Sequence, residues 1–471
     1  MTNSFGLFSI KNSINFIKIM KYLIHFFIVF SIFFTECKAQ DVSKNEIKFS
    51  KKIKEYKTFS EDGAWCWFSD PRAVHLNNKI YSGWVSSEGS IMVASYNEIT
   101  KETKEFNLYS KFNKDDHANP SFLILPDKKI MIFFSAHSKN GIDEGSIDGG
   151  ISYTISTNPE SISSWEPLKK IPQTFEGKKL LCYTNPIMLS EENNRIYLFW
   201  RGADWKPTFS YSDDLGINWS NPKKLLQSTK ILYKRPYVKV VSNGKDEIHF
   251  AFTDGHPRNE PFNNIYYLKY KKGNFYKSNG TIIGNNSSLP LEHEDCDIVY
   301  DSHKEFLKSR NAVKSWIWDI ALNEDGYPAI VYTRLPEETK HIYYYANWDG
   351  GNWQNSMISP AGSSFPRFKR NKEQRDPEPH YSGGIYLDHE NTNTVYYSKP
   401  VNDIFEIFKA IKLNEKWIES SITMESKKDN VRPYSIMGAD KNAKTQLLWM
   451  YNDYYQSYTD YKTKIKMDLK E

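Results

Sequence analysis

The chain repeats one short strand pattern seven times, and this repetition restricts its fold more than any other feature. Each repeat opens with an apolar strand, a polar turn and a second apolar strand, and further strands containing Tyr, Ser or Trp follow. The turns are rich in Asp, Asn and Gly, as in Asn323–Gly326, which is typical of β-hairpins. The opening strand pairs lie at residues 73–75 and 80–84, 120–125 and 130–135, 186–188 and 196–200, 237–241 and 248–252, 318–322 and 328–332, 384–387 and 394–398, and 434–437 and 446–450.

Repeated units of this kind predict an all-β fold, and seven of them predict a seven-bladed β-propeller. Radial repetition would protect the edges of the sheets. The segment Ser212–Trp219 matches the Asp-box pattern S-x-D-x-G-x-x-W, a turn between the outer strands of a blade. We expect its Asp to accept hydrogen bonds from turn amides and Trp219 to pack between blades. The alternative architecture, two β-sandwiches, fits the number of repeats less well.

The composition excludes several other classes of protein. Aromatic residues make up 15% and charged residues 25% of the 471 positions, so neither a disordered chain nor a multi-span membrane protein fits. The net charge of +5 is too small to indicate nucleic-acid binding. Cys66, Cys182 and Cys296 remain beyond the first forty residues, and their spacing predicts no disulfide framework. We expect a monomer that is stabilised by a large core.

The amino-terminal segment is typical of a signal peptide. Two lysines precede a mostly apolar run at 23–34, and Gln40 follows a small-x-small cleavage site. Met20 is an alternative start, and the apolar run is too short to be a membrane span. We expect export to the periplasm or secretion, without lipidation of Cys37, because the residues before that cysteine are unfavourable. The expected division is a signal peptide at 1–39, a lead-in at 40–60 and one propeller catalytic domain at 61–471.

The repeat positions also predict where a binding site lies. The first strand of a propeller blade lines the central channel and the second returns beside it, so the start of one and the end of the other emerge on the same face. Imidazoles, guanidiniums and phenols collect on that face, which makes it the expected binding site. The strand starts are 70–72, 115–120, 183–186, 235–237, 316–319, 380–382 and 432–434, and the strand ends are His137, Arg201, 253–256, Arg334, Lys399 and Asn452.

Cations and aromatic rings on this face favour an acidic polysaccharide or oligosaccharide as partner. Arg binds carboxylate or sulfate in a bidentate manner, and Tyr or Trp supplies a flat surface for sugar rings. The group His117, His137, Tyr183 and Arg201 includes side chains that exchange protons near neutral pH. We therefore regard these four residues as the candidate catalytic group.

The same face lacks the two separated carboxylates that a glycosidase uses. Asp115 and Asp116 are adjacent, and in an extended segment their side chains should diverge. A reaction that uses His, Tyr and Arg without such a pair is β-elimination from a uronic acid. Arg would neutralise the carboxylate, His or Tyr would remove the C5 proton, and Tyr or His would protonate the oxygen that leaves C4.

Each candidate residue also has a structural interpretation. A histidine in a turn is often no more than a hydrogen-bonding residue, although His117 and His137 occupy equivalent ends of one blade's inner strands, which favours a shared site. The other structural alternatives are an Arg201–Asp204 ion pair, Tyr183 in the core, and Arg235 and Tyr237 in packing between blades.

Six short motifs occur in a fixed order along the chain. They are DDHANPS at 115–121, FSAH at 134–137, YTNP at 183–186, LFWRG at 198–202, RPYVK at 235–239 and TDGHPR at 253–258. This ordered set resembles the BNR-repeat ulvan lyases, polysaccharide lyase families twenty-four and twenty-five, and family twenty-five more closely. The resemblance extends from about Trp65 to about Asp440. It implies a secreted seven-bladed propeller that cleaves ulvan, a polymer of sulfated rhamnose and uronic acid, by β-elimination.

The resemblance also implies roles for individual residues. His117, His137 and Tyr183 would form the acid–base group, and Arg201 would neutralise the uronate carboxylate. Which of His117 and Tyr183 is the base and which is the acid stays open. The expected substrate-binding residues on the same face are Asn119, Arg235, Tyr237, His256 and Arg258.

One difference from the family concerns a metal. The resemblance implies a structural zinc held by histidines and a Cys-x-His motif. His256 is present, but Leu268–Tyr270 occupies the Cys-x-His position, and Lys206 lies near the place of another histidine. Cys296 with His293 is a weak substitute for a site that needs about four nitrogen or sulfur ligands. We therefore predict neither a metal nor a cofactor, the zinc being either lost or held by other residues.

Three classes of function fit these features to different degrees. The first is a lyase acting on uronic acid, either an endo-lyase or a dehydratase that removes water from a terminal uronic acid. The segments 281–314 and 367–375 could wall off one end of the channel, which would favour the dehydratase. The second class is a sialidase-type hydrolase, which needs a Tyr–Glu pair that is not evident near Tyr237 or Tyr434. The third is a non-catalytic sugar-binding propeller.

Overall fold

The computed structural model describes residues 56–137, 150–172, 181–229, 234–310, 313–337, 340–362 and 383–469. All of them belong to the unit Phe49–Glu471. The expected signal peptide, most of the expected lead-in and the basic loop 367–375 lie outside the described residues.

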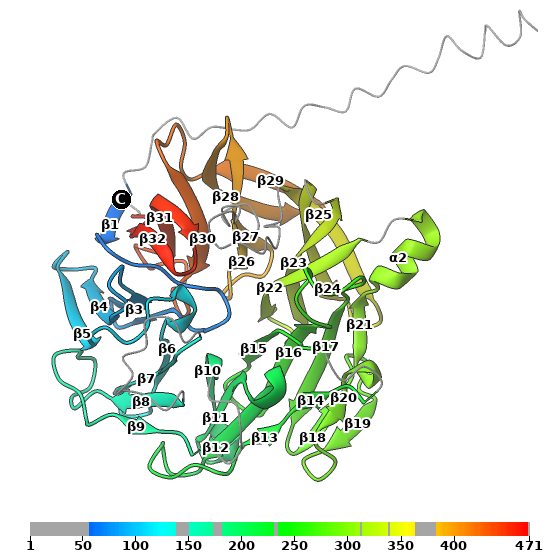
Figure 1. The fold of residues 1–471 in the computed structure, drawn as a ribbon, viewed down its shortest axis with the longest axis horizontal. Coiled ribbons are helices and arrows are strands. Elements are labelled where there is room, and N and C mark those ends of the chain that lie inside the picture. Colours follow the sequence, from blue (N-terminus) through cyan, green and yellow to red (C-terminus); the bar gives the residue numbers. More distant parts are fainter. Residues whose placement is uncertain are drawn as a thin grey trace, which may run out of the picture. The chain divides into compact units, whose positions relative to one another are not determined.

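Seven antiparallel sheets are arranged around a central axis, which confirms the predicted seven-bladed β-propeller (Figure 1). Each opening strand pair expected from the repeats forms the inner two strands of a blade. Blade 1 consists of β2 (Ala73–Leu76), β3 (Lys79–Val85), β4 (Ile91–Asn97) and β5 (Thr103–Tyr109). Blade 2 consists of β6 (Ser121–Ile124), β7 (Ile130–Ser135), β8 (Ile151–Ile155) and β9 (Lys169–Lys170). Blade 3 consists of β10 (Cys182–Leu189), β11 (Arg195–Arg201), β12 (Pro207–Ser212) and β13 (Lys223–Lys224).

The remaining blades follow the same order along the chain. Blade 4 contains β15 (Val238–Ser242), β16 (Glu247–Thr253), β17 (Ile265–Lys271), β18 (Asn274–Tyr276), β19 (Ile282–Asn285) and β21 (Asp297–Tyr300). Blades 5 and 6 contain β22 (Lys314–Leu322), β23 (Pro328–Glu337), β24 (Lys340–Trp348) and β25 (Trp353–Gly362), and β26 (Ile385–Leu387), β27 (Thr394–Val401), β28 (Ile404–Leu413) and β29 (Lys416–Ser421). Blade 7 contains β30 (Asp429–Ser435), β31 (Leu447–Ser457), β32 (Asp460–Met467) and β1 (Lys57–Ser60).

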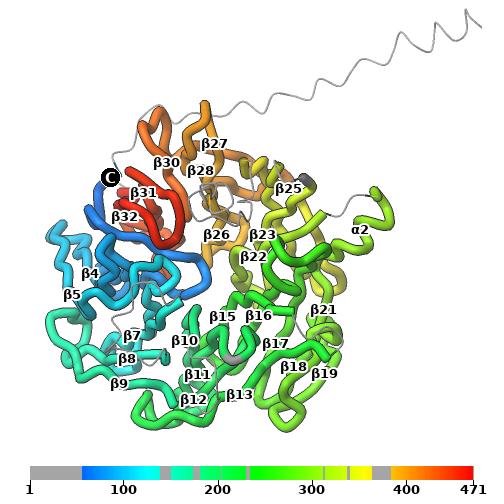
Figure 2. The backbone as a smooth tube through the Cα atoms, in the orientation of Figure 1, coloured from blue at the N-terminus to red at the C-terminus, as the bar shows by residue number. Residues whose placement is uncertain are grey.

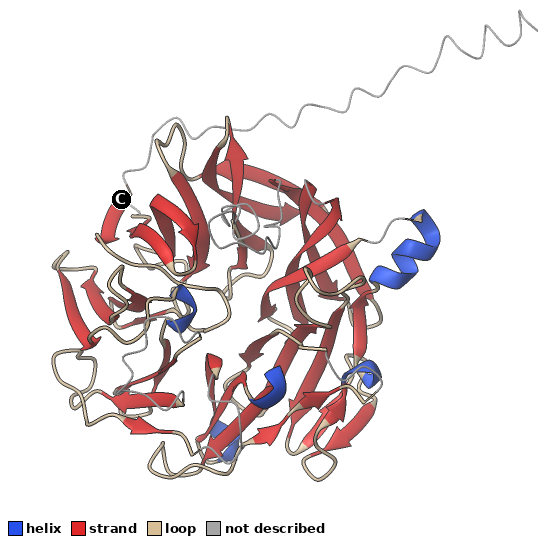
Figure 3. Cartoon of the chain, viewed as in Figure 1, coloured by secondary structure: helices blue, strands red, loops and turns tan. Residues whose placement is uncertain are grey.

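Helical structure in the described residues is limited to short elements (Figure 3). These are α2 (Ser302–Ser309) and the 3-10 turns η1 (Asp116–Ala118), η2 (Ser190–Glu192), η3 (Ala203–Trp205) and η4 (His293–Asp295). No helix in this part of the chain is long and apolar enough to cross a membrane. In the segment 281–314, β19 and β21 extend the outer part of blade 4 by pairing with β18 and β17, and β20 (Leu291–Glu292) pairs with β14 (Leu226–Gln227).

The two ends of the described chain meet in blade 7. β1 pairs with β32, with Lys57 opposite Met467, and Figure 2 shows the blue amino-terminal strand beside the red carboxy-terminal one. The expected boundary at residue 61 therefore leaves out a strand that belongs to the propeller. The short strand KTFS carries only one large apolar residue, Phe59, so the repeat pattern does not reveal it.

Phe59 anchors this closing strand, and its truncation should destabilise the propeller. Its side chain is 2% exposed and packs edge-on against Trp84, with ring centroids 5.9 Å apart. Phe59→Ala should cost about 3 kcal/mol of unfolding free energy and lower the melting temperature by roughly 3 to 6 °C. Ile99→Ala, at a side chain that is 68% exposed, is the control and should leave the midpoint nearly unchanged. Equal midpoints for the two variants would contradict a role of β1 in closure.

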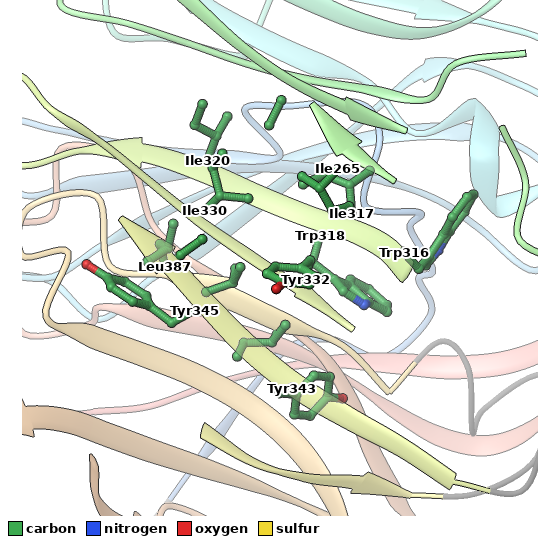
Figure 4. Packing of buried hydrophobic residues seen from close by; sticks show 14 of the residues in the cluster. Ile265, Trp316, Ile317, Trp318, Ile320, Ile330, Tyr332, Tyr343, Tyr345 and Leu387 are labelled. Atoms are coloured by element: carbon green, nitrogen blue, oxygen red, sulfur yellow. The ribbon is translucent and has the colours of Figure 1, made fainter. Parts of the chain in front are cut away.

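Buried side chains fill the spaces between neighbouring blades. Trp318 of β22 stacks on Trp67 with ring centroids 4.1 Å apart, and both side chains are buried. Figure 4 shows Trp318 in one cluster with Ile265 of β17 and Leu387 of β26, so this cluster joins blades 4, 5 and 6. Aromatic side chains such as Trp67 and Trp318 thus contribute to the packing between sheets.

The Asp-box turn has the expected structure. Asp214 Oδ1 accepts a hydrogen bond from Asn218 N at 2.8 Å. Trp219 packs edge-on against Phe133 and Tyr153 of blade 2, with ring centroids 5.8 Å apart in both cases. The turn of blade 3 therefore holds its tryptophan against the neighbouring blade, as predicted.

Buried ion pairs connect the inner segments of three blades. Arg72 Nε donates to Asp70 Oδ1 at 2.9 Å, and Lys239 of β15 donates to Oδ2 of the same aspartate. Tyr386 of β26 donates to that Oδ2 at 3.2 Å. All four side chains are buried, and each charge has a partner of opposite sign, as buried charges require. Arg72, expected among the groups of the binding face, thus belongs to the interior.

Candidate functional site

The four predicted catalytic residues come together at one end of the inner strands of blades 2 and 3. The His117 and His137 rings stack with centroids 4.3 Å apart and an interplanar angle of 16°. The Tyr183 ring lies 5.8 Å from His117 and 5.7 Å from His137, and Arg201 Cζ lies 4.6 Å from the Tyr183 ring. The strand positions therefore predicted this cluster correctly.

Local backbone geometry directs these side chains. His117 lies in η1, whose N-cap residue Asp115 accepts a hydrogen bond from His117 N at 3.0 Å. Tyr183 has φ +69°, in the left-handed region that residues with a side chain rarely adopt. The register of β10 against β11 shifts between Cys182 and Asn185, so the strand pairing is irregular, as in a β-bulge, in the stretch that contains Tyr183. Bulges redirect side chains and are frequent beside active sites, where such backbone strain is concentrated.

Asp115 joins the two histidines. Its Oδ1 lies 3.0 Å from His117 Nδ1, and its Oδ2 lies 2.9 Å from His137 Nδ1. Asp116 Oδ1 lies 2.7 Å from the same His117 Nδ1. The expectation that the two carboxylates diverge is wrong, because a 3-10 turn replaces the extended segment on which that expectation rested. Both carboxylates are fully buried, so neither is placed as the acid or nucleophile of a glycosidase.

Asp116 is neutralised by a residue of the last blade. Arg432 Nη1 donates to Asp116 Oδ2 at 2.6 Å, and Arg432 Nη2 donates to Tyr455 Oη at 2.6 Å. Tyr455 Oη in turn donates to Asp116 Oδ2 at 2.6 Å. The sequence places Arg432 at a strand start but predicts no partner for it, because contacts between blades that are not neighbours cannot be read from the spacing.

The pKa values of the titratable groups in the site are shifted in different directions. Burial lowers the pKa of His117, but the adjacent carboxylates of Asp115 and Asp116 act in the opposite direction, and the pKa is raised above its ordinary value. Burial lowers the pKa of His137. Asp115 acts in the opposite direction, but the positive charges of His117 and Arg201 offset its effect, so the pKa stays below its ordinary value. Burial raises the pKa of Tyr183 well above its ordinary value, against the influence of Arg201. At neutral pH we therefore expect a charged His117, a neutral His137 and a protonated Tyr183.

Arg201 is held by aromatic side chains. Its Nη1 donates to Tyr237 Oη at 2.8 Å, and its Cζ lies 4.6 Å from the Trp205 ring. The alternative ion pair with Asp204 is not formed, since Asp204 Oδ2 lies 3.2 Å from Lys224 Nζ. Arg201 is 7% exposed, and no carboxylate of the described residues forms an ion pair with it. Such a guanidinium is well suited to an anionic ligand.

Three of the predicted substrate-binding residues lie next to this cluster. The Tyr237 ring lies 5.8 Å from Tyr183 and 4.8 Å from Trp316. The His256 ring lies 5.9 Å from Tyr237 and 4.9 Å from Trp316, and Arg258 N donates to His256 Nδ1 at 3.1 Å. Burial and the charge of Arg258 lower the pKa of His256 to about 3, so this imidazole is neutral.

The other two predicted binding residues differ in exposure and in the contacts that they make. Arg235 is exposed, and its Cζ lies 5.2 Å from the Trp205 ring. Asn119 is buried, accepts a hydrogen bond from Cys66 N at 3.1 Å and donates to Ser69 O at 3.3 Å. Its amide ties η1 to the segment before blade 1, and its assignment to substrate binding stays a prediction.

Two aromatic residues of the site were missed from the sequence. Trp205 lies in the turn after β11 with φ +61°, and its ring contacts both Arg201 and Arg235. Tyr458 of blade 7 meets the two histidine rings edge-on, with centroids 5.0 and 5.6 Å away. The position of Trp205 just beyond a strand end is a usable signal, whereas nothing in the repeat pattern points to Tyr458.

Trp205 should matter because it orients two arginines. A cation–π contact contributes about 0.5 to 2 kcal/mol, so Trp205→Ala should lower kcat/KM by roughly 2- to 30-fold. Trp205→Phe keeps an aromatic face and should recover most of the loss. Steady-state kinetics on an acidic saccharide substrate measures both variants, and thermal unfolding checks the fold. Activity of the alanine variant close to that of the wild type would exclude an orienting role.

At the positions where the resemblance implies zinc ligands, the side chains make other contacts. Leu268 is buried in an apolar cluster, and Tyr270 Oη bonds a neighbouring tyrosine. Lys206 Nζ donates to a backbone oxygen, and His293 Nε2 lies 3.2 Å from Asp254 Oδ1. An aliphatic side chain, a phenol and an ammonium group do not replace the nitrogen and sulfur ligands that zinc requires.

Within the described part of the chain, one group of three side chains brings possible metal-binding atoms together. The atoms of Asp115, His117 and His137 lie within 4.8 Å of one another. Both histidine Nδ1 atoms lie at hydrogen-bond distance from Asp115 oxygens, so these groups already bind each other.

The fold and site define a propeller of the BNR-repeat class. The chain matches the family described as "BNR repeat-containing family member" over residues 79–361, and it belongs to that family. It is 25% identical over 325 residues to the ulvan lyase of Alteromonas sp. (strain LOR), a match that covers 60% of this chain and 63% of that protein. The resemblance seen in the six motifs is thus confirmed.

Two solved structures are similar to this chain over most of its length. Both are of an ulvan lyase of polysaccharide lyase family twenty-five, and one is bound to -[GlcA(1-4)Rha3S]-. Each has a TM-score of 0.65 and covers 88% of this chain and 96% of its own, at 16% and 15% identity. At this identity the likeness establishes the propeller fold.

Proposed function

We propose that this protein is a lyase that acts on uronic acid residues of ulvan-type sulfated saccharides and produces unsaturated uronate by β-elimination. The observation that carries the proposal is the buried Arg201, which has no carboxylate partner among the described residues and lies against Tyr183. The stacked pair of His117 and His137 lies beside that tyrosine. The similarity to ulvan lyases supports the same substrate class.

In the proposed reaction each group has one task. Arg201 binds the uronate carboxylate and acidifies the C5 proton. His137, neutral and bonded to Asp115 through Nδ1, accepts that proton at Nε2. The C4–O bond breaks as the C4–C5 double bond forms, and Tyr183 donates its phenolic proton to the leaving oxygen. His117 carries a positive charge, which suits it to stabilise negative charge rather than to accept a proton.

The sialidase-type alternative finds less support. Tyr237 Oη accepts its hydrogen bond from Arg201, whereas a sialidase nucleophile would pair with a glutamate. Tyr434 is fully buried, 4.4 Å from the Arg72 guanidinium, and so does not face a substrate. A binding-only propeller needs no coupled histidine pair and no strained tyrosine at its site.

The proposal is tested with ulvan polymer and with ulvan oligosaccharides. For an endo-lyase, the viscosity of the polymer falls while the absorbance of unsaturated uronate rises. For a terminal dehydratase, only oligosaccharides gain the chromophore, and mass spectrometry shows the loss of one water. Formation of no unsaturated product from either substrate, with binding retained, would refute the lyase and favour the binding-only propeller.

A further inference from the structure

We propose that Asp115 is a positioning residue that holds both histidines by their Nδ1 atoms and limits the pair to one shared positive charge. The geometry of this arrangement is independent of the substrate. Its consequence for catalysis rests on the lyase activity proposed above.

The first step is the pairing geometry. Asp115 has two oxygens, and each lies 2.9 to 3.0 Å from one imidazole Nδ1. The carboxylate of Asp115 is itself held in place, because its Oδ1 also accepts a hydrogen bond from His117 N at the start of η1. With both Nδ1 atoms engaged, each ring has its Nε2 available for chemistry, and the tautomer of a neutral ring is set by the carboxylate. Asp115 is thus the carboxylate shared by His117 and His137, and Asp116 Oδ1 adds a second contact to His117 Nδ1 at 2.7 Å.

The second step is a count of buried charges. Arg432 is paired with Asp116, so these two charges cancel. Asp115 then remains as one negative charge against two imidazoles, and one imidazolium balances it. A second proton on the pair would leave an uncompensated positive charge in a buried site beside Arg201, which is strongly unfavourable. We therefore expect the two imidazoles together to carry one positive charge at pH values around neutrality.

The other groups around the pair do not alter this count. Burial raises the pKa of both Tyr183 and Tyr461, so these phenols stay protonated. The titratable and charged groups that face the two histidines, directly or through the aspartates, are Cys66, Asp115, Asp116, Cys182, Tyr183, Arg201, His256, Arg432, Tyr455, Tyr458 and Tyr461. A pair coupled in this way loses its protons in two well-separated steps that belong to the pair. Between those steps one ring of the unliganded site stays neutral while the other keeps its charge. The uronate carboxylate that the proposed function places on Arg201 would supply the negative charge against which the neutral ring accepts the C5 proton.

The decisive variant is Asp115→Asn. Asparagine offers one acceptor oxygen and no charge, so it can hold only one Nδ1–H and cannot balance an imidazolium. Removal of a negative charge disfavours the protonated forms, so both pKa values of the pair should fall. The alkaline limb of the kcat profile should move to lower pH by at least about one unit. At the wild-type optimum, kcat should fall by at least about 100-fold with little change in KM.

Nitrogen-15 NMR of the full-length protein with labelled histidines gives a readout that needs no activity. In the wild type, one site imidazole should stay charged and its partner neutral through neutral pH, both protonated at Nδ1. Two ordinary, independent titrations in the wild type would overturn the proposal, even if no variant folds. A wild type with this NMR pattern but no unsaturated product would refute the proposed function and leave the pairing standing.

Glu98→Gln is the matched control. Glu98 is 3% exposed, and its Oε2 lies 3.0 Å from His75 Nε2, so this variant also removes the charge of a buried carboxylate bonded to an imidazole. It should leave the kcat profile and the two site resonances unchanged. An identical alkaline shift in both variants, or an unshifted profile in a folded Asp115→Asn protein, would show that Asp115 does not set the proton count.

Discussion

Replacement of Arg201 by alanine should lower kcat/KM on a uronic acid substrate by about 10³-fold or more. The guanidinium is buried among aromatic rings, and its Nη1 is bonded to the Tyr237 hydroxyl. It is therefore already in place to hold a carboxylate when negative charge develops on it after C5 deprotonation. Loss of this group removes both binding and acidification of the C5 proton, so kcat and KM should change together. Initial rates of unsaturated-uronate formation measure the effect.

A matched control lies at the other end of the same strand. Arg195 of β11 is 29% exposed, and its Nε lies 2.6 Å from Asp213 Oδ1. Arg195→Ala should keep kcat/KM within about twofold, because a surface ion pair contributes little. Arg201→Lys retains the charge but loses the planar fork, so its activity should lie between those of the wild type and the alanine variant. A folded Arg201→Ala protein with less than a tenfold loss would remove Arg201 from the mechanism.

The fold could be predicted because the alternation of apolar residues in the strands and the number of repeats can be recognised in the sequence. Each inner strand pair was recognisable from alternating apolar residues and from turns such as Asn323–Gly326, which adopt hairpins for local reasons. The same logic placed His117, His137, Tyr183 and Arg201 on one face. What local pattern does not contain is the closing strand β1, whose partner β32 lies about four hundred residues away along the chain.

The chemistry inside the site depended on contacts that spacing does not encode. The pairing of Asp115 with both histidines follows from a 3-10 turn, and the pairing of Asp116 with Arg432 joins blades 2 and 7. Asn119 is polar and close to Asp115 and Asp116 in sequence, and its side-chain amide is hydrogen-bonded to backbone atoms of Cys66 and Ser69. Such distinctions require the three-dimensional burial of each side chain, and a list of residues on one face cannot supply them.

Tyr183→Phe should lower kcat by about 10³-fold and leave KM and the melting temperature nearly unchanged. Phenylalanine preserves the ring that packs against Arg201 and the two histidines, so the loss isolates the hydroxyl. Because the pKa of Tyr183 is raised, its hydroxyl is protonated at the start of the reaction and can act as the acid. The control Tyr153→Phe removes a buried hydroxyl that donates to Gly216 O at 2.9 Å in the Asp-box turn, and it should leave kcat unaffected.

The leaving group separates the acid role of Tyr183 from a base role. A synthetic uronide that carries 4-nitrophenol at C4 releases a stable phenolate and needs no proton donor. Tyr183→Phe should therefore process this substrate within about tenfold of the wild-type rate, while a sugar leaving group remains slow. If Tyr183 were the base, proton removal from C5 would fail for both substrates, and the aryl leaving group would bring no rescue. In that case the neutral imidazole of His137 would not be the group that accepts the proton, and the assignment of the acid and the base would have to be exchanged.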